Sequence, residues 1–365
     1  MITVHYDEKP IYDIYIEKDY GRLEEAFLTL DNVKNKKVCI VSETNVAPLY
    51  LKAVEAHAEK CFKKVTSFVF EAGEEHKNLD TVQNLYEHLI LEHFERVDML
   101  IALGGGVTGD LTGYAAATYL RGISFIQMPT TLLSQVDSSI GGKTGVDFKA
   151  YKNMVGAFHQ PSLVYMNLST LNTLTDEQYF EGMGEIIKHG LIKDASYYEW
   201  LKAHMCEIEE RNLDICSEMI SVSCNIKRRV VEADPKEKGE RGLLNFGHTL
   251  GHAIEKVSNF GRLHGECVAL GCAAASWISW QRGLLTEEQY EDIKAVFMRA
   301  HLPIQIDEIN EEEALEAIKH DKKMESGKLK FILLNGPGNG FIDRSVTHEE
   351  MEAALKTVLS GGVHA

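Results

Sequence analysis

The chain has 365 residues, 55 of them acidic and 38 basic, so its formal net charge is −17. This charge argues against a partner such as nucleic acid or an anionic membrane surface. The share of hydrophobic residues, 44%, is typical of a soluble globular protein. The seven cysteines form no Cys-x-x-Cys pair, the N-terminus lacks a signal-peptide pattern, and the longest uncharged apolar run, 267–280, is shorter than the ~18 residues of a membrane span. We therefore expect a cytoplasmic protein.

The first half of the chain alternates strand-like and helix-like segments. Runs rich in β-branched and apolar residues predict strands at 37–45, from 64 onward, at 98–106 and at 123–131. Helical spacing of apolar residues predicts helices at 49–62 and 79–94. Strands and helices in alternation predict a mostly parallel sheet with helices on its faces.

The second half has a different character. Helical patterns follow one another at 176–193, 195–211, 213–233, 245–258, 265–282, 286–300 and 311–319, and strand-like runs are rare until 328–336. We therefore expect two domains, an α/β domain over 1–170 and a helical domain over 171–365.

A glycine cluster follows the predicted strand at 98–106, in LIALGGGVTGDLTGYAAA. Backbone N–H groups at the start of the next helix can approach a pyrophosphate there, which favours nucleotide binding. The spacing differs from the usual Gly-x-Gly-x-x-Gly, so a tight strand-to-helix turn is the alternative interpretation.

A second glycine-rich stretch, SSIGGKTGVD, lies in a locally basic region. It lacks the spacing of a Walker A loop. Between 121 and 160 the chain carries four basic residues against two acidic ones, which indicates a phosphate site in a chain of this net charge. The basic residues are Arg121, Lys143, Lys149 and Lys152; for Lys149 a solvated loop position is the simpler interpretation.

Histidines and a glutamate beside glycines predict a metal site. His248 and His252, in LNFGHTLGHAIEK, are one helical turn apart and face the same side of a helix. His264 begins the next predicted helix, and Glu185 lies in FEGMGEIIKHG. A catalytic zinc ion takes three protein ligands, and spacing alone does not select three of these four. Thr249 stands where a zinc peptidase has its catalytic glutamate, which argues against that class.

Cationic side chains surround this region in the sequence. Arg241 and Lys227 suit a carboxylate or a phosphate. Asn245 precedes His248 by three residues and His252 by seven, so all three can share one helix face.

Taken together, these motifs resemble the 3-dehydroquinate synthase family. The matching segments, in that family's order, are GGGVTGD, MPTTLLSQVDSSIGGKTGVD, KNMVGAFHQP, GMGEIIKHG, LLNFGHTLGHAIE and LHGECVALG. The resemblance implies a Rossmann-like α/β NAD-binding domain, an all-α metal- and substrate-binding domain and an active site in the cleft between them. It also implies conversion of 3-deoxy-D-arabino-heptulosonate 7-phosphate to 3-dehydroquinate and phosphate, by transient NAD-dependent oxidation, phosphate elimination, re-reduction and aldol closure.

The resemblance assigns residues by motif. The ligands of one divalent metal, zinc or cobalt, would be Glu185, His248 and His264, with His252 an active-site histidine beside the phosphate. NAD would contact Asn45, Glu74, Lys77, Gly105, Gly106, Val107, Asp110, Thr130, Thr131, Lys152, Thr170, Leu171 and Thr173. The catalytic and substrate-binding set would be Arg121, Asp137, Lys143, Asn153, Lys188, Lys227, Arg241, Asn245 and His252, together with Lys322 or Lys323. Arg121 resembles an arginine that reaches into a neighbouring subunit, which implies a homodimer.

Three alternatives remain at this point. A sister cyclase would act on sedoheptulose 7-phosphate or glucose 6-phosphate. These substrates lack a carboxylate, so the joint presence of Lys227, Arg241 and the Lys322/Lys323 pair favours the shikimate substrate. An NAD-dependent polyol dehydrogenase would release NADH and would not need the cations around Lys143 and Lys152. A non-enzymatic relative would be expected to lose His248, Glu185 or Lys143, and the sequence keeps all three.

Overall fold

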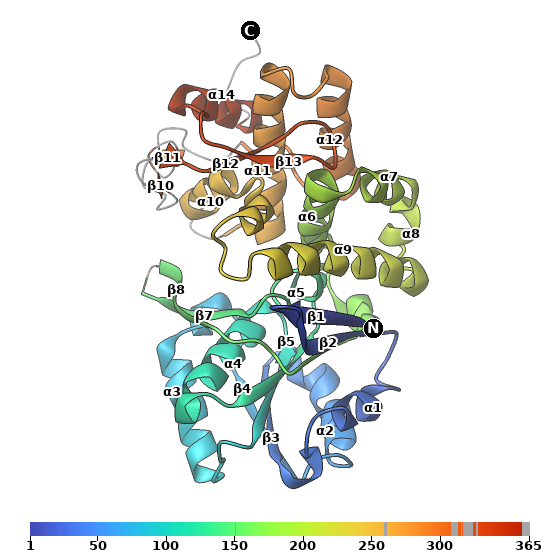
Figure 1. Ribbon diagram of the computed structural model, residues 1–365, viewed down its shortest axis with the longest axis vertical. Coiled ribbons are helices and arrows are strands. Elements are labelled where there is room, and N and C mark those ends of the chain that lie inside the picture. Colours follow the sequence, from blue (N-terminus) through green and yellow to red (C-terminus); the bar gives the residue numbers. More distant parts are fainter. Residues whose placement is uncertain are drawn as a thin grey trace. The chain divides into compact units, whose positions relative to one another are not determined.

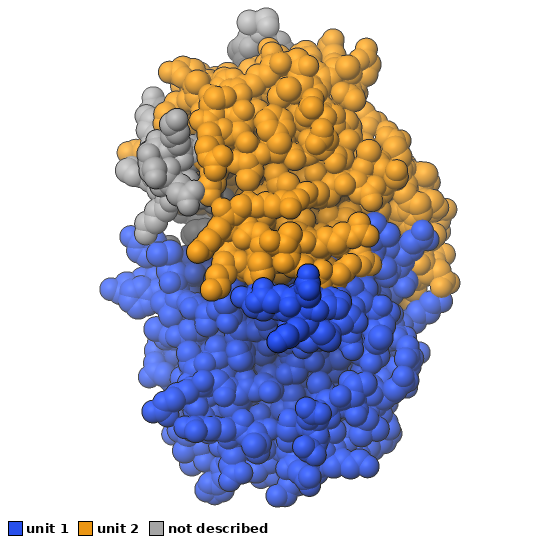
Figure 2. All heavy atoms as spheres, in the orientation of Figure 1, with its two compact units in different colours: residues 1–174, 216–224 blue, residues 175–215, 225–365 orange. Residues whose placement is uncertain are grey.

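The computed structural model describes residues 1–149, 151–258, 261–307, 313–314, 316, 324–325 and 328–359. The chain forms two compact units, coloured in Figure 2. The first comprises residues 1–174 and 216–224, and the second comprises residues 175–215 and 225–365. Helix α9 (Leu213–Ala233) thus contributes its middle residues to the first unit, a division that helical spacing does not reveal.

The first unit is built on a seven-stranded sheet with the order β1-β2-β9-β6-β5-β3-β4 (Figure 1). Every neighbouring pair runs parallel except β1 and β2. The expected mostly parallel sheet is confirmed, although the sequence did not predict β1, β2 or β9. The strands are β1 (Ile2–Tyr6), β2 (Lys9–Glu17), β3 (Lys37–Glu43), β4 (Lys64–Phe70), β5 (Met99–Gly104), β6 (Ser124–Pro129) and β9 (Leu163–Asn167).

The strand order creates a switch point between β3 and β5. The chain moves from β3 to β4 on one side and then to β5 on the other side of β3. For the five strands β3, β4, β5, β6 and β9 this is the doubly wound order 2-1-3-4-5, in which ligands bind beyond the carboxyl ends of the strands at the switch point. The carboxyl end of β5 carries the glycine cluster, so the topology brings that cluster to this position.

Helices cover both faces of the sheet because alternate residues of each strand point to opposite sides. Val38 and Ile40 of β3 pack in a core with α1 and α2, whereas Cys39 and Val41 pack in a second core with α3 and α4. The helices and helical turns of this unit are α1 (Leu23–Leu28), η1 (Val33–Asn35), η2 (Ala47–Leu51), α2 (Lys52–Ala58), η3 (Glu74–His76), α3 (Leu79–Leu91), α4 (Gly106–Thr118), η4 (Tyr119–Arg121), α5 (Leu132–Val136) and η5 (Leu168–Thr173).

The basic, glycine-rich stretch forms a hairpin that the sequence did not predict. Its strands β7 (Lys143–Phe148) and β8 (Tyr151–Phe158) pair antiparallel. Strand β7 packs on α4, where a Cβ at Gly113 would lie 2.4 Å from Thr144 Cγ2. Gly113 is therefore required for the hairpin to lie this close to the helix.

The second unit is mainly helical, as expected. The predicted helices 176–193 and 213–233 match α6 and α9, but the prediction for 195–211 splits at His204 into α7 and α8. The unit is not exclusively α-helical, because short hairpins β10–β11 and β12–β13 follow α12. Most of the predicted helix 311–319 lies outside the described residues. The elements are α6 (Asp176–Lys193), α7 (Ala195–Ala203), α8 (Met205–Glu209), η6 (Glu240–Asn245), α10 (His248–Val257), α11 (His264–Gln281), α12 (Glu287–Arg299), β10 (Met324–Glu325), β11 (Lys328–Leu329), β12 (Phe331–Leu334), β13 (Gly340–Asp343) and α14 (His348–Val358).

Helix α11 is the central element of this unit. It contacts α6, α10, α12 and α14 (Figure 1), and nearly all its residues between Gly265 and Ser279 are buried. A helix that is apolar on every side is expected at the centre of a helical unit. Its apolar run 267–280 is therefore part of the core. Among the described residues, no helix combines the length and apolar character that a membrane span requires.

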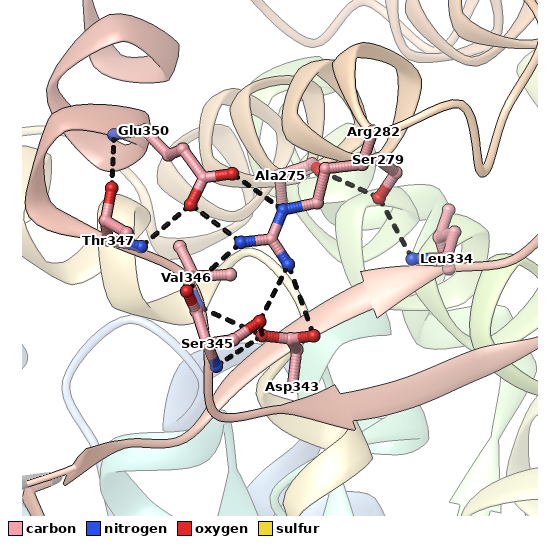
Figure 3. Close-up of polar contacts among 9 residues, drawn as sticks. All are labelled: Ala275, Ser279, Arg282, Leu334, Asp343, Ser345, Val346, Thr347 and Glu350. Atoms are coloured by element: carbon pink, nitrogen blue, oxygen red, sulfur yellow. Dashed lines mark hydrogen bonds and ion pairs between the residues drawn. The ribbon is translucent and has the colours of Figure 1, made fainter.

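Arg282 at the end of α11 joins three elements (Figure 3). Its guanidinium makes a two-bond pair with Glu350 of α14, with Nε to Oε1 2.6 Å and Nη2 to Oε2 2.7 Å. The same group lies 3.3 Å from Asp343 Oδ2 and donates to Ser345 Oγ at 3.1 Å. Glu350 and the other acceptors raise the pKa of Arg282, so it stays charged.

Replacing Arg282 with methionine is expected to lower the free energy of unfolding by about 1–2 kcal/mol, because charge-assisted hydrogen bonds are lost at a partly exposed site. Urea unfolding of the purified variant measures this change. Arg22 makes a similar pair with Glu25, but at 49% side-chain exposure. Arg22→Met is therefore the matched control, and an equal loss for both variants would contradict the role of burial.

Candidate active site

The carboxyl ends of β3, β5 and β6 carry most of the residues expected to bind a nucleotide. Gly105 is the N-cap of α4, which begins at Gly106, so free N–H groups of the first helical turn lie at this edge. Thr130 follows β6, and its N–H donates to Gly104 O at 3.0 Å. The buried Thr130 hydroxyl has no hydrogen-bond partner among the described residues. Together these groups supply donors suited to a pyrophosphate.

The neighbouring expected contacts lie on the same edge or next to it. Thr131 caps α5 and lies 3.3 Å from the position of a Cβ on Gly105. Asn45 follows β3 and is exposed. Thr170, Leu171 and Thr173 belong to η5, where Tyr50 hydrogen-bonds to Thr173 Oγ1.

Lys77 links several of the expected residues through its buried ammonium group. Nζ lies 2.8 Å from Asp110 Oδ2 and 3.5 Å from Glu74 Oε1, and it donates to Asn153 Oδ1 at 2.7 Å. Burial lowers the pKa of Lys77, but Asp110 and Glu74 outweigh this and keep the pKa raised. The ammonium therefore stays charged and joins α4 to the hairpin strand β8.

The other expected residues of the first unit are placed as follows. Asn153 and Lys152 lie on β8, Lys143 begins β7, and Asp137 is the C-cap that follows α5. Arg121 is exposed in a turn where it and Leu120 both have a positive φ, 72° and 48°. Residues other than glycine adopt this backbone conformation at a cost, so the turn is a strained segment.

In the second unit, three helices present the expected metal ligands to one another. His248 Nε2 of α10 lies 3.6 Å, and His264 Nε2 of α11 lies 3.5 Å, from Glu185 Oε1 of α6. One ligand atom from each residue falls within 4.8 Å of the other two. Two imidazoles and one carboxylate form a typical three-ligand site for Zn²⁺, and imidazole nitrogen also suits Co²⁺.

Glycines let these helices approach. A Cβ at Gly265 of α11 would lie 1.9 Å from Glu181 O of α6, and one at Gly184 would lie 2.7 Å from Gly265 O. Between α10 and α11, a Cβ at Gly251 would lie 2.5 Å from Cys267 O. The glycines beside the ligands in the sequence thus have a packing reason, because backbones in direct contact bring the ligand side chains together.

Neighbouring groups orient the ligands. His248 Nδ1 lies 3.2 Å from Phe246 O, so it donates there and leaves Nε2 available for a metal. Burial lowers the pKa of His264, but Glu185 and Glu255 more than offset this and raise the pKa to about 10. The two carboxylates favour a positive charge at the ring. Either a proton or a bound divalent cation can supply that charge.

The prediction that Asn245, His248 and His252 share one helix face is wrong for Asn245. Gly247 has a left-handed backbone conformation, with φ 78°, and α10 begins only at His248, whereas Asn245 ends η6. His248 and His252 do share a face, with ring centroids 5.0 Å apart. Asn245 Nδ2 donates to Glu237 Oε1 at 2.8 Å, a contact that no motif in the sequence indicated.

Among the described residues of this unit, three lysine and arginine side chains are buried. Lys188 pairs with Glu185 one turn before it on α6 and is 1% exposed. Lys227 of α9 and Arg241 of η6 are also buried, and Arg241 Nη1 donates to Pro235 O at 2.9 Å. Buried charged groups occur at functional sites as well as in structural ion pairs, so their burial is compatible with the predicted chemistry without testing it. Lys322 and Lys323 lie outside the described residues.

Comparison with known proteins matches both halves of the chain to one family. The family model for the N-terminal part of 3-dehydroquinate synthase matches residues 67–181, and the model for its C-terminal part matches residues 182–324. The 3-dehydroquinate synthase of Nitrosospira multiformis is 43% identical over 336 residues, 92% of this chain and 90% of that protein. That of Acetivibrio thermocellus is 42% identical over 330 residues, 88% of this chain and 89% of that protein.

Solved structures of sugar phosphate cyclases share the fold. A 2-epi-5-epi-valiolone synthase from Streptomyces hygroscopicus subsp. jinggangensis 5008, with NAD⁺ and Zn²⁺ bound, has a TM-score of 0.86 at 28% identity and covers 98% of this chain and 99% of its own. A 2-deoxy-scyllo-inosose synthase complexed with carbaglucose-6-phosphate, NAD⁺ and Co²⁺ has a TM-score of 0.87 at 24% identity and covers 98% and 100%. The expected fold class, an α/β domain followed by a helical region, is confirmed.

Proposed function

The chain belongs to the 3-dehydroquinate synthase family, and from this premise we propose which of its residues carry out the family's reaction. The reaction converts 3-deoxy-D-arabino-heptulosonate 7-phosphate to 3-dehydroquinate and phosphate, in the shikimate pathway to the aromatic amino acids. The chain is accordingly a carbon–oxygen lyase that uses NAD and one divalent metal ion. The observation that carries our residue assignment is the convergence of Glu185, His248 and His264 from three helices.

Glu185, His248 and His264 would hold the metal, either Zn²⁺ or Co²⁺. Their donor atoms fit such an ion in kind and number, and the buried Lys188 pairs with Glu185 and holds its carboxylate. When bound, the metal supplies Lewis-acid polarisation of substrate oxygens, and NAD supplies reversible hydride transfer. Zinc is bound in a structural relative 28% identical to this chain.

The residues at the carboxyl edge of the sheet would bind NAD. The N-terminus of α4, the Thr130 hydroxyl and the switch point between β3 and β5 support this assignment. Asn45, Thr131 and Thr170 lie on the same edge or follow its strands, and Lys77 carries positive charge beside Asp110.

The polar residues would bind and orient the sugar phosphate. Lys143, Asn153, Asn245 and His252 hold the phosphate, and Arg241 and Lys227 hold the carboxylate as an orienting clamp. Asp137 and Lys188 would each serve in proton transfer. Support comes from the charge and burial of Lys227 and Arg241, because a cation held away from bulk water attracts an anionic ligand more strongly than an exposed one does.

We further propose a cytoplasmic homodimer in which Arg121 completes the partner's phosphate site. The exposed position of Arg121 in a strained turn supports this role. Sedimentation of Arg121→Ala and of the natural chain tests the assembly, and an active monomer would contradict it.

The test of the function is turnover with limiting nucleotide. Purified protein is incubated with 3-deoxy-D-arabino-heptulosonate 7-phosphate and substoichiometric NAD⁺ while phosphate and NADH absorbance are followed. We expect many phosphates released per NAD⁺, no accumulation of NADH and loss of activity with a chelator. Turnover of sedoheptulose 7-phosphate or glucose 6-phosphate instead would indicate a sister cyclase, and steady NADH release with glycerol would indicate a polyol dehydrogenase.

A further inference from the structure

His264 lies between two carboxylates that come from different helices. Its Nε2 is 3.5 Å from Glu185 Oε1, and its Nδ1 is 3.9 Å from Glu255 Oε2. The ring therefore turns one nitrogen toward the proposed metal ligands and the other toward Glu255. Glu255 is 7% exposed, so its carboxylate is held away from bulk water beside this ring.

A histidine that binds a metal usually donates its second ring N–H to a carboxylate or a carbonyl. This contact fixes the tautomer and the orientation of the ring and makes the ligating nitrogen more basic. For His248 the acceptor is the carbonyl of Phe246. For His264 the group at the corresponding nitrogen is the carboxylate of Glu255.

We propose that Glu255 is a positioning residue for His264. Its carboxylate lies 3.9 Å from Nδ1 and would accept the Nδ1–H of the ring once it closes that distance, so that Nε2 keeps its lone pair directed toward Glu185 and His248; this inference rests on the proposed metal site. The position agrees with the sequence of α10, because His248, His252 and Glu255 follow one another at i, i+4 and i+7 on one face. This face of α10 thus supplies one proposed ligand, His248, and the residue that positions another, Glu255 beside His264.

A second cation bound by His252, Glu255 and His264 is the competing interpretation. Their ligand atoms also lie within 4.8 Å of one another. Two cations at once would require His264 to bind one through each ring nitrogen, but a neutral imidazole has a lone pair on only one of them. The positioning role requires no further deprotonation and is therefore favoured.

The test measures metal affinity rather than activity. The metal-free full-length chain and its variants Glu255→Ala and Glu255→Gln are titrated with Zn²⁺ against a chromophoric chelator. We expect roughly 10- to 100-fold weaker binding for the alanine variant, the usual cost of losing such a support. The glutamine variant should lose less, because its amide oxygen still accepts a hydrogen bond. The visible absorption of bound Co²⁺ should change for both variants.

Two further variants make the result decisive. Glu266→Gln changes another glutamate close to His264, one that lies 3.9 Å from Arg262, and it should bind zinc as the natural chain does. His248→Ala tests the site itself: if it keeps full affinity, the proposed metal site fails. If only His248→Ala loses affinity, the role of Glu255 alone is overturned. Two zinc ions per natural chain, with one lost in both Glu255 variants, would also overturn it. Should the alanine variant not fold, the nearly isosteric glutamine variant decides.

Discussion

Replacing His248 with alanine is expected to abolish metal binding and, with it, turnover. The substitution removes one of three donors, whose Nε2 lies 3.6 Å from Glu185 Oε1. A site with two protein ligands has lost much of the chelation that defines a catalytic metal centre. Removing a residue that only supports a metal ligand weakens metal binding by up to about 100-fold. Because His248 is itself a proposed ligand, the loss in zinc affinity should exceed about 100-fold. Chelator competition measures the affinity, and phosphate release measures turnover.

NAD⁺ affinity provides the internal control for this variant. The proposed nucleotide residues belong to the first unit and His248 to the second. Titration with NAD⁺ should therefore give nearly the same dissociation constant as for the natural chain. His301→Ala is the matched substitution, since His301 is 57% exposed and pairs with Glu209. Wild-type zinc affinity in His248→Ala, or an equal loss in His301→Ala, would contradict the assigned ligand set.

The alternation of strands and helices could be predicted because it is a local pattern. The residues of β3, β5 and β6 are apolar runs of the length that buried parallel strands require. The order of the strands is set by pairing between distant segments, so the switch point between β3 and β5 appeared only in the structure. Strand β8 has no apolar periodicity because most of its residues are exposed, and its hairpin was therefore missed.

The identities of the site residues were predicted largely from the resemblance. The contacts between these residues could not be predicted from the sequence. Motifs named Glu185, His248 and His264, but spacing alone would have made His252 an equal ligand. Extending the helix back to Asn245 failed because a left-handed glycine, Gly247, interrupts it. Glu255 had a usable signal, its position seven residues after His248 on the same helical face. Such a signal gains meaning only when another helix brings His264 opposite it.

Replacing Gly265 with alanine is expected to destabilise the second unit and weaken metal binding together. In an ordinary helix, glycine to alanine stabilises by up to about 1 kcal/mol, because alanine restricts the unfolded chain and favours the helix. At Gly265 the new methyl group would lie 1.9 Å from Glu181 O, which is backbone of the neighbouring helix and cannot rotate away. Overpacking of this kind costs about 1–3 kcal/mol, so the sign of the effect reverses.

The consequence for the metal follows from the sequence position of Gly265. His264 is the adjacent residue, and Glu185 lies one helical turn after Glu181 on α6. Any movement of α11 that relieves the contact with Glu181 also separates His264 from Glu185. Gly242→Ala is the control, because a Cβ there would meet only Ile342 Cδ1, at an ordinary 3.6 Å. Urea unfolding and zinc titration of both variants separate the two effects: lower stability with unchanged zinc affinity in Gly265→Ala would mean that the ligand set does not depend on the close approach of α6 and α11.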